Sequence, residues 1–86
     1  MAYKVEYKES VEKDLKGVDR SRKAEILKSI DSDLAAAPRK KGKPLKGAWK
    51  GLWRYDGVRP YRVIYAVLQD ETILIVRIGH RKDVCR

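Results

Sequence analysis

Two strand-like segments separated by only three residues constrain the fold of this chain more than any other feature. Residues 61–68 are rich in β-branched and aromatic side chains, and residues 72–78 are apolar almost throughout, interrupted by Arg77. So short a connection joins antiparallel neighbours, because a parallel pair needs a crossover of about a dozen residues or more. The pattern predicts a hairpin whose second strand is central and ends at Gly79. Arg77 is then expected on an exposed sheet face, beside an acidic partner, or extended into solvent at the strand edge.

The other segments predict one strand before the hairpin, two helices and a third meander strand. Apolar and polar residues alternate over residues 3–7, which is typical of a half-buried strand. Helical spacing predicts a short helix over residues 10–17 and a second helix from residue 19 or 21 to Pro38. Residues 52–55 predict a further strand. The second helix is expected to bury one side, made of Ala24, Leu27, Ile30 and Leu34.

Together these elements predict an α+β fold. An N-terminal strand is followed by a two-helix antiparallel hairpin and a three-stranded antiparallel meander, with the helices packed on one face of the sheet. Residues 38–51 hold three glycines, two prolines and six cations, so we expect a basic loop there. At 86 residues the chain fits a single domain, residues 1–86, with one small core.

The excess positive charge of the chain lies in its second half. Residues 1–37 hold eight Lys or Arg and eight Asp or Glu, whereas residues 38–86 hold thirteen against four. Such a surplus attracts polyanions, so nucleic acid is the first partner to consider. Trp49 and Trp53 could stack on unpaired bases, although core packing is favoured for tryptophans in so small a domain.

Composition also excludes several classes of protein. The chain has no run of about 18 apolar residues, and charges occupy the start, where a signal peptide needs an apolar stretch. We therefore expect a cytoplasmic protein with no membrane partner. Cys85 is the single cysteine and His80 the single histidine, too few for a tetrahedral zinc site. No metal and no cofactor are expected.

Three arginines form the candidate site. Arg54, Arg62 and Arg81 fall near the ends of three neighbouring meander strands, where the turns could bring them together. Guanidinium groups hold phosphate bidentately and stabilise the extra charge of a pentavalent transition state. Because the basic half lacks a carboxylate cluster for Mg²⁺, this chemistry favours metal-free RNA cleavage by the substrate's own 2′-hydroxyl. The group that transfers protons stays open between His80 and three lysines, Lys46, Lys50 and Lys82.

The second half of the chain also carries a family resemblance. The run KPLKG, AWKG and LWRYDGVRPYRVIYAV, followed by IVRIGHRKDV, resembles the RelE branch of the RelE/ParE toxin superfamily over essentially the whole chain. The resemblance implies the toxin of a type II toxin-antitoxin system. It implies a ribosome-dependent, metal-independent endoribonuclease, an mRNA interferase that cleaves mRNA in the ribosomal A site and so inhibits translation and growth. The implied partners are the ribosome, mRNA and a cognate acidic, RelB-like antitoxin in a hetero-oligomer.

The resemblance also implies roles for single residues. Arg62 in YRVIY and Arg81 in GHR match the family's phosphate-binding and transition-state-stabilising arginines. Arg54 in LWR matches a position where relatives place a basic residue that contacts the RNA backbone or acts as the base. His80 matches a position where relatives carry His or Lys. A basic surface for RNA and the ribosome is expected from Lys40, Lys41, Lys43, Lys46, Lys50 and Lys82.

Two departures from the family pattern bear on activity. Relatives often follow GHRKDV with a tyrosine that stacks on the base or helps proton transfer, and Cys85 occupies that position. A thiol has no aromatic face, so endoribonuclease activity could be reduced. Some relatives carry two alternating lysines where this chain has Leu52 and Arg54, and arginine is a poor base.

Two other functions therefore stay open. One is a ParE-like inhibitor of DNA gyrase, against which the GHRKDV ending and Arg81 argue. The other is a module that retains binding to the antitoxin or the ribosome without catalysis, which the replacement at Cys85 favours.

Overall fold

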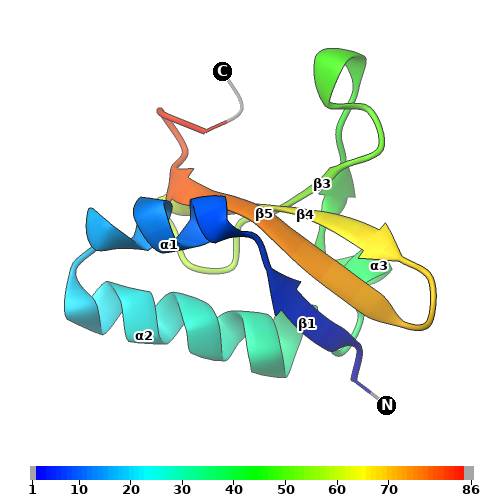
Figure 1. Cartoon of the computed structure of the whole chain (residues 1–86), viewed down its shortest axis with the longest axis horizontal. Helices are drawn as coiled ribbons and strands as arrows, with labels where there is room; N and C mark the ends of the chain where they lie inside the picture. Colours follow the sequence, from blue (N-terminus) through cyan, green and yellow to red (C-terminus); the bar gives the residue numbers. More distant parts are fainter. Residues whose placement is uncertain (1, 85–86) are drawn as a thin grey trace.

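A five-stranded sheet in the order β1-β5-β4-β3-β2 organises the fold (Figure 1). The computed structural model describes residues 2–84. Along the chain the elements are β1 (Lys4–Tyr7), α1 (Glu9–Lys16), α2 (Arg20–Ser29), the π-helical turn η1 (Ile30–Leu34), α3 (Pro38–Lys41), β2 (Lys43–Pro44), the 3-10 turn η2 (Gly47–Trp49), β3 (Trp53–Tyr55), β4 (Tyr61–Leu68) and β5 (Thr72–His80). The predicted α+β class and order of elements are confirmed.

The β4–β5 hairpin is the centre of the sheet. The two strands pair antiparallel from Tyr61 opposite His80 to Leu68 opposite Thr72, as the sequence predicts. β5 does not end at Gly79, because its pairing with β4 continues to His80. The other edge of β5 pairs in parallel with β1, which places the first strand of the chain beside the last one.

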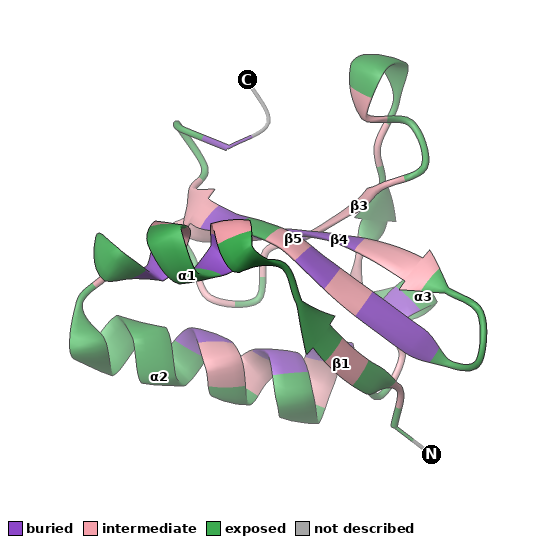
Figure 2. Cartoon of the chain, viewed as in Figure 1, coloured by how far each residue is buried: buried purple, intermediate pink, exposed green. Residues whose placement is uncertain are grey.

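Helices α1 and α2 lie on one face of the sheet (Figure 1). Buried residues of the helices and of the sheet, purple in Figure 2, form one hydrophobic core. The predicted buried side of the second helix is wrong at Ala24, which is exposed. Ile26, Ile30 and Leu34 form the buried side. Ala24 precedes Ile26 by two residues and so points about 200° away around the helix.

Helix α1 covers the edge of β5 after residue 75, where the pairing of β5 with β1 ends. Ser10 and Asp14, one helical turn apart, face this edge: the Ser10 hydroxyl donates to the carbonyl oxygen of Val76 at 2.7 Å, and Asp14 Oδ2 accepts from the backbone N–H of Ile78 at 2.9 Å. These contacts satisfy backbone groups that a neighbouring strand would otherwise bond. They fix α1 against the half of β5 that leads to the C-terminal turn.

Residues 38–51 are not a plain loop, so that prediction is wrong in part. Pro38 begins α3 at a position where its missing N–H is no loss. Lys43 and Pro44 form the two-residue edge strand β2, which pairs with β3, and an edge strand tolerates proline. The segment between β2 and β3, with η2 at its tip, projects from the rest of the molecule (Figure 1).

Two buried tyrosines tie the sheet to the segments that surround it. The Tyr65 hydroxyl donates to the carbonyl oxygen of Pro38 at 2.6 Å, and the Tyr55 hydroxyl donates to Asp33 Oδ2 at 2.7 Å. Burial raises the pKa of Tyr55 to about 12 and also raises that of Tyr65. Trp53 stacks on Tyr65 with ring centroids 6.4 Å apart, so its predicted core packing is confirmed.

No helix within residues 2–84 has the length and apolar character to span a membrane.

Candidate nucleic-acid interface

The structure brings the three candidate arginines to one cavity of about 200 Å³. Arg54 in β3 pairs with Ile64 in β4, and Arg62 lies two residues before Ile64, so both arginines project from the same face of the sheet. Their chain neighbours Tyr55 and Val63 belong to the core beneath the helices. The arginines therefore occupy the face away from α1 and α2.

Arg81 reaches the cavity from the segment that follows β5. Its backbone N–H donates to the carbonyl oxygen of Pro60 at 2.9 Å, which holds this segment beside the β3–β4 turn. Lys43 enters from β2, where it pairs with Arg54. The complete lining is Lys43, Arg54, Asp56, Arg59, Pro60, Arg62 and Arg81. Five cations against one carboxylate make this cavity suited to an anionic ligand.

Sequence reasoning missed two charged residues of the site, Arg59 and the carboxylate Asp56. Its Oδ1 accepts from Arg62 Nε at 2.9 Å, and its Oδ2 lies 3.8 Å from Arg54 Nε. The Arg62 side chain is only 18% exposed, so this pair fixes it well below the surface. The available signal was an acidic residue in the turn that joins two arginine-bearing strands.

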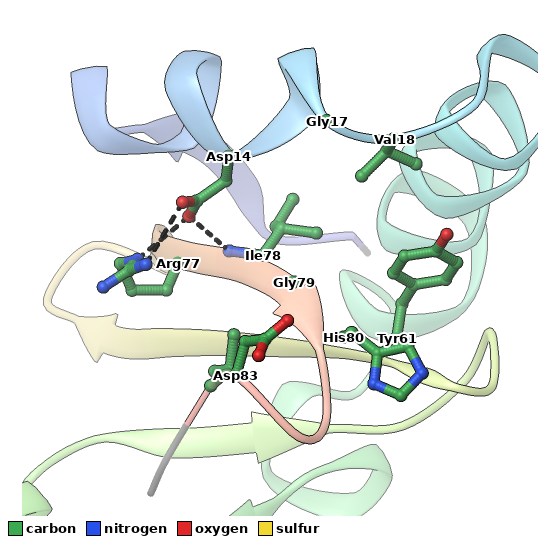
Figure 3. Close-up of a pocket in the computed structure, with 10 residues that line it drawn as sticks. Asp14, Gly17, Val18, Tyr61, Arg77, Ile78, Gly79, His80 and Asp83 are labelled. Carbon is green, nitrogen blue, oxygen red and sulfur yellow. Dashed lines mark hydrogen bonds and ion pairs between the residues drawn. The ribbon is translucent and has the colours of Figure 1, made fainter.

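His80 is not part of the arginine cavity. It lines a separate cavity of about 400 Å³, together with Tyr61, Asp14 and Asp83 (Figure 3). Its ring packs edge-on against Tyr61, with centroids 6.2 Å apart, and its Nδ1 accepts from the backbone N–H of Lys82 at 3.2 Å. Tyr61 pairs with His80 across the hairpin, so both point to the face opposite that of Arg62.

The predicted lysines are spread over three places. Lys43 lines the arginine cavity, whereas Lys41 forms an ion pair with Asp33 at 3.2 Å. Both lysines also line an adjoining cavity of about 280 Å³, which shares Arg54, Asp56 and Arg59 with the first. The remaining predicted lysines, Lys40, Lys46, Lys50 and Lys82, are exposed. Cys85 lies outside the described residues.

Arg77 has an acidic partner, as one of the sequence interpretations predicted. Asp14 accepts from its Nε at 3.0 Å and from its NH2 group at 3.2 Å (Figure 3). The hydrogen bond to Asp14 and the charge of this carboxylate raise the pKa of Arg77. This bidentate pair lies at the junction of α1 and β5 and gives Arg77 a role in the fold.

Comparison with known proteins identifies the class to which this fold and basic site belong. The model of a family described as the ParE toxin of the type II toxin-antitoxin system parDE matches residues 5–84, so the chain belongs to this family. It is therefore a toxin of the RelE/ParE superfamily. No curated protein matches the sequence.

Solved structures of toxins share the fold. A chain of the RelBE2 toxin-antitoxin complex from Mycobacterium tuberculosis superposes with a TM-score of 0.86 at 26% identity, covering 94% of this chain and 100% of that one. A mutant of the Escherichia coli toxin RelE in the free state gives a TM-score of 0.76 at 17% identity, covering 98% and 88%. YafQ from Escherichia coli gives 0.67 at 22%, covering 98% and 99%.

Proposed function

We propose that this toxin is a ribosome-dependent, metal-independent endoribonuclease that cleaves mRNA in the ribosomal A site and thereby inhibits translation and growth. The observation that carries the proposal is the convergence on one cavity of Arg54 from β3, Arg62 from β4 and Arg81 from the segment that follows β5. The likeness to RelE structures supports the fold that such an enzyme requires. This activity would place the protein in the cytoplasm, where ribosomes and mRNA are found.

The cavity suits transfer at a phosphodiester. The arginines would hold the scissile phosphate and stabilise the charge that develops when the neighbouring 2′-hydroxyl attacks phosphorus. That attack breaks the bond to the 5′-oxygen and leaves a 2′,3′-cyclic phosphate. Asp56 is the one carboxylate in the lining, and it already contacts two guanidinium groups, so the cavity offers poor ligands for Mg²⁺.

For proton transfer in this cavity we propose a residue outside the candidates that the sequence left open, His80 and three lysines. His80 lines the other cavity, so it could assist only after a rearrangement. Arginine hardly ever deprotonates. Lys43 lines the cavity and pairs with Arg54, which makes it our candidate for moving the proton of the 2′-hydroxyl.

We also infer that an acidic antitoxin binds this toxin. The formal net charge of +9 and the cation-lined cavity favour a partner that supplies negative charge. The similar structure from Mycobacterium tuberculosis is itself a toxin-antitoxin complex. A hetero-oligomer in which a RelB-like segment covers the arginines would keep the toxin from RNA.

A second function, inhibition of DNA gyrase, is favoured by the match to the ParE family model. A third, binding without catalysis, follows from Cys85 at the position where RelE-like relatives carry tyrosine. The arginine cavity favours the nuclease over both, because neither alternative requires three guanidinium groups around one cavity.

The test is cleavage of mRNA in programmed ribosomes, mapped by primer extension, with naked RNA as control. Arg81→Ala should lower the rate by roughly 100-fold or more, because it removes a charge that stabilises the transition state. Arg22→Ala, an exposed arginine of α2, is the matched control and should cleave like wild type. Cleavage equal in all three proteins would contradict the proposed site.

If the wild-type protein does not cleave mRNA, two further experiments distinguish the causes. If Cys85→Tyr then cleaves, the chain is a weakened enzyme of this class. If no variant cleaves, a DNA supercoiling assay with purified gyrase decides: inhibition supports the ParE-like function, and its absence leaves binding as the function.

A further inference from the structure

Asp56 is a carboxylate in a cavity lined by five cations, and its negative charge would repel the phosphate that we propose binds there. Asp56 begins the turn between β3 and β4 and lines both the arginine cavity and the adjoining one. It is 31% exposed, and each of its two oxygens faces a different guanidinium, Oδ1 that of Arg62 and Oδ2 that of Arg54.

The position of Asp56 relative to the two guanidinium groups indicates which of their nitrogens can meet a ligand. Both arginines approach Asp56 through Nε. The Arg62 contact is a hydrogen bond at 2.9 Å, whereas the Arg54 contact, at 3.8 Å, is an ion pair. A guanidinium presents five N–H donors in a fixed planar fork, so a contact at Nε sets the plane and leaves the edge formed by the two terminal NH2 groups available. This edge is one that can hold two phosphate oxygens.

Asp56 also counters repulsion within the site. Arg54, Arg62 and Arg81 line a cavity of about 200 Å³ together with Arg59 and Lys43. Like charges at such spacing favour side-chain conformations that spread into water. A shared counter-ion anchored in the backbone turn holds two of them in place before the ligand arrives, and such preorganisation lowers the cost of binding the transition state.

We propose that Asp56 is a positioning residue: it holds Arg62 by a hydrogen bond at Nε, attracts the Nε side of Arg54 as a longer ion pair, and so leaves the terminal NH2 groups of both arginines for one RNA phosphate. The proposal rests on the proposed nuclease function for its catalytic consequence. The contact of Asp56 with the two arginines does not depend on whether the protein cleaves RNA. The competing account is that Asp56 merely occupies the anion site and leaves when RNA enters.

The experiment combines NMR and kinetics on the full chain, with Asp56→Asn as the test variant. Asp70→Asn is the matched control, because it makes the same chemical change in the turn at the far end of the β4–β5 hairpin. The NMR probe is the Arg62 Nε–H signal, assigned by its loss in Arg62→Lys. The ligand is a short RNA whose cleavable 2′-hydroxyls are replaced by hydrogen.

In the wild type and in Asp70→Asn, we expect the Arg62 Nε–H proton to exchange slowly with water and to keep its shift when the oligonucleotide binds. Asp56→Asn should lose this protection. On ribosomes, Asp56→Asn should lower kcat by about 10- to 100-fold, since misplaced groups cost rate steeply. Its affinity for the oligonucleotide should equal or exceed that of wild type, because a negative charge has left the cavity. If Asp56 only stabilised the fold, its loss would lower both kcat and the affinity for the oligonucleotide.

Two results would overturn the proposal. One is an Arg62 Nε–H signal that moves from its free position on oligonucleotide binding to the position seen in Asp56→Asn, which would make Asp56 a displaced placeholder. The other is an Asp56→Asn protein that cleaves as fast as wild type. If the wild type itself does not cleave, the proposed function fails, and the NMR signal alone still decides whether Asp56 positions the arginines.

Discussion

Gly42 lies where any side chain would collide with the core, so Gly42→Ala should destabilise the protein strongly. A Cβ atom at this position would lie 1.7 Å from the Tyr65 hydroxyl oxygen and 2.8 Å from the carbonyl oxygen of Arg54. Neither atom can move aside cheaply. Tyr65 is fully buried, stacks on Trp53 and donates to the Pro38 carbonyl, and the Arg54 carbonyl belongs to β3.

The magnitude follows from two losses. Overpacking of a filled core costs about 1–3 kcal/mol. Displacing the Tyr65 hydroxyl from Pro38 adds about 1 kcal/mol for a buried hydrogen bond. The free energy of unfolding should therefore fall by about 2–4 kcal/mol, which for a domain of this size lowers Tm by roughly 10–30 °C.

Urea denaturation followed by circular dichroism measures this change. Gly17→Ala is the matched control, because its Cβ would lie 3.9 Å from the Asp14 carbonyl oxygen, an ordinary contact; its stability should stay within about 0.5 kcal/mol of wild type. In a Tyr65→Phe background, Gly42→Ala should cost about 1 kcal/mol less, because the closest atom is gone. Equal costs in both backgrounds, or a Gly42→Ala protein as stable as wild type, would refute the reasoning.

Two further predictions concern carboxylates of the first half of the chain. Asp14→Asn should lower the free energy of unfolding by about 1–3 kcal/mol, since Asp14 accepts hydrogen bonds from Arg77 and from the Ile78 backbone. Urea denaturation measures this change, with Asp31→Asn as the control. Equal stability of the two variants would contradict the prediction. The hydrogen bonds from Tyr55 and Lys41 hold the pKa of Asp33 below its usual value. A lowered native pKa contributes stability that is present above the unfolded pKa and lost as pH falls through the native one. Between about pH 5 and pH 2, stability should therefore fall less steeply in Tyr55→Phe than in wild type, and parallel pH profiles would disprove the link.

Much of the fold could be predicted because its strongest elements are encoded locally. The strand over residues 61–68 and the turn after it follow from β-branched residues and a short polar connection, and the structure places β4 at the predicted residues. The convergence of Arg54, Arg62 and Arg81 could be inferred because meander strands are neighbours in space. These inferences need only strand direction and order.

The remaining features depend on the face to which a residue points. His80 was grouped with Arg81, yet adjacent residues near a strand end project to opposite sides, and pairing with Tyr61 places His80 on the helix side. The strand β2 was missed because two residues that include Pro44 carry no periodicity. Asp56 was missed because its role appears only when two arginines from different strands flank it.

The central position of β5 has a consequence for how the protein is made. β5 bonds β1 on one side and β4 on the other, so the sheet cannot close until residues 72–80 have left the ribosome. At about 5–20 residues per second, β1 and both helices emerge several seconds earlier, with no strand to cover their apolar sides. The arginine cavity likewise does not exist before Arg81 is added. The sheet and the arginine cavity thus form late in the synthesis of this domain, and an antitoxin already in the cell would meet each new toxin as its site first forms.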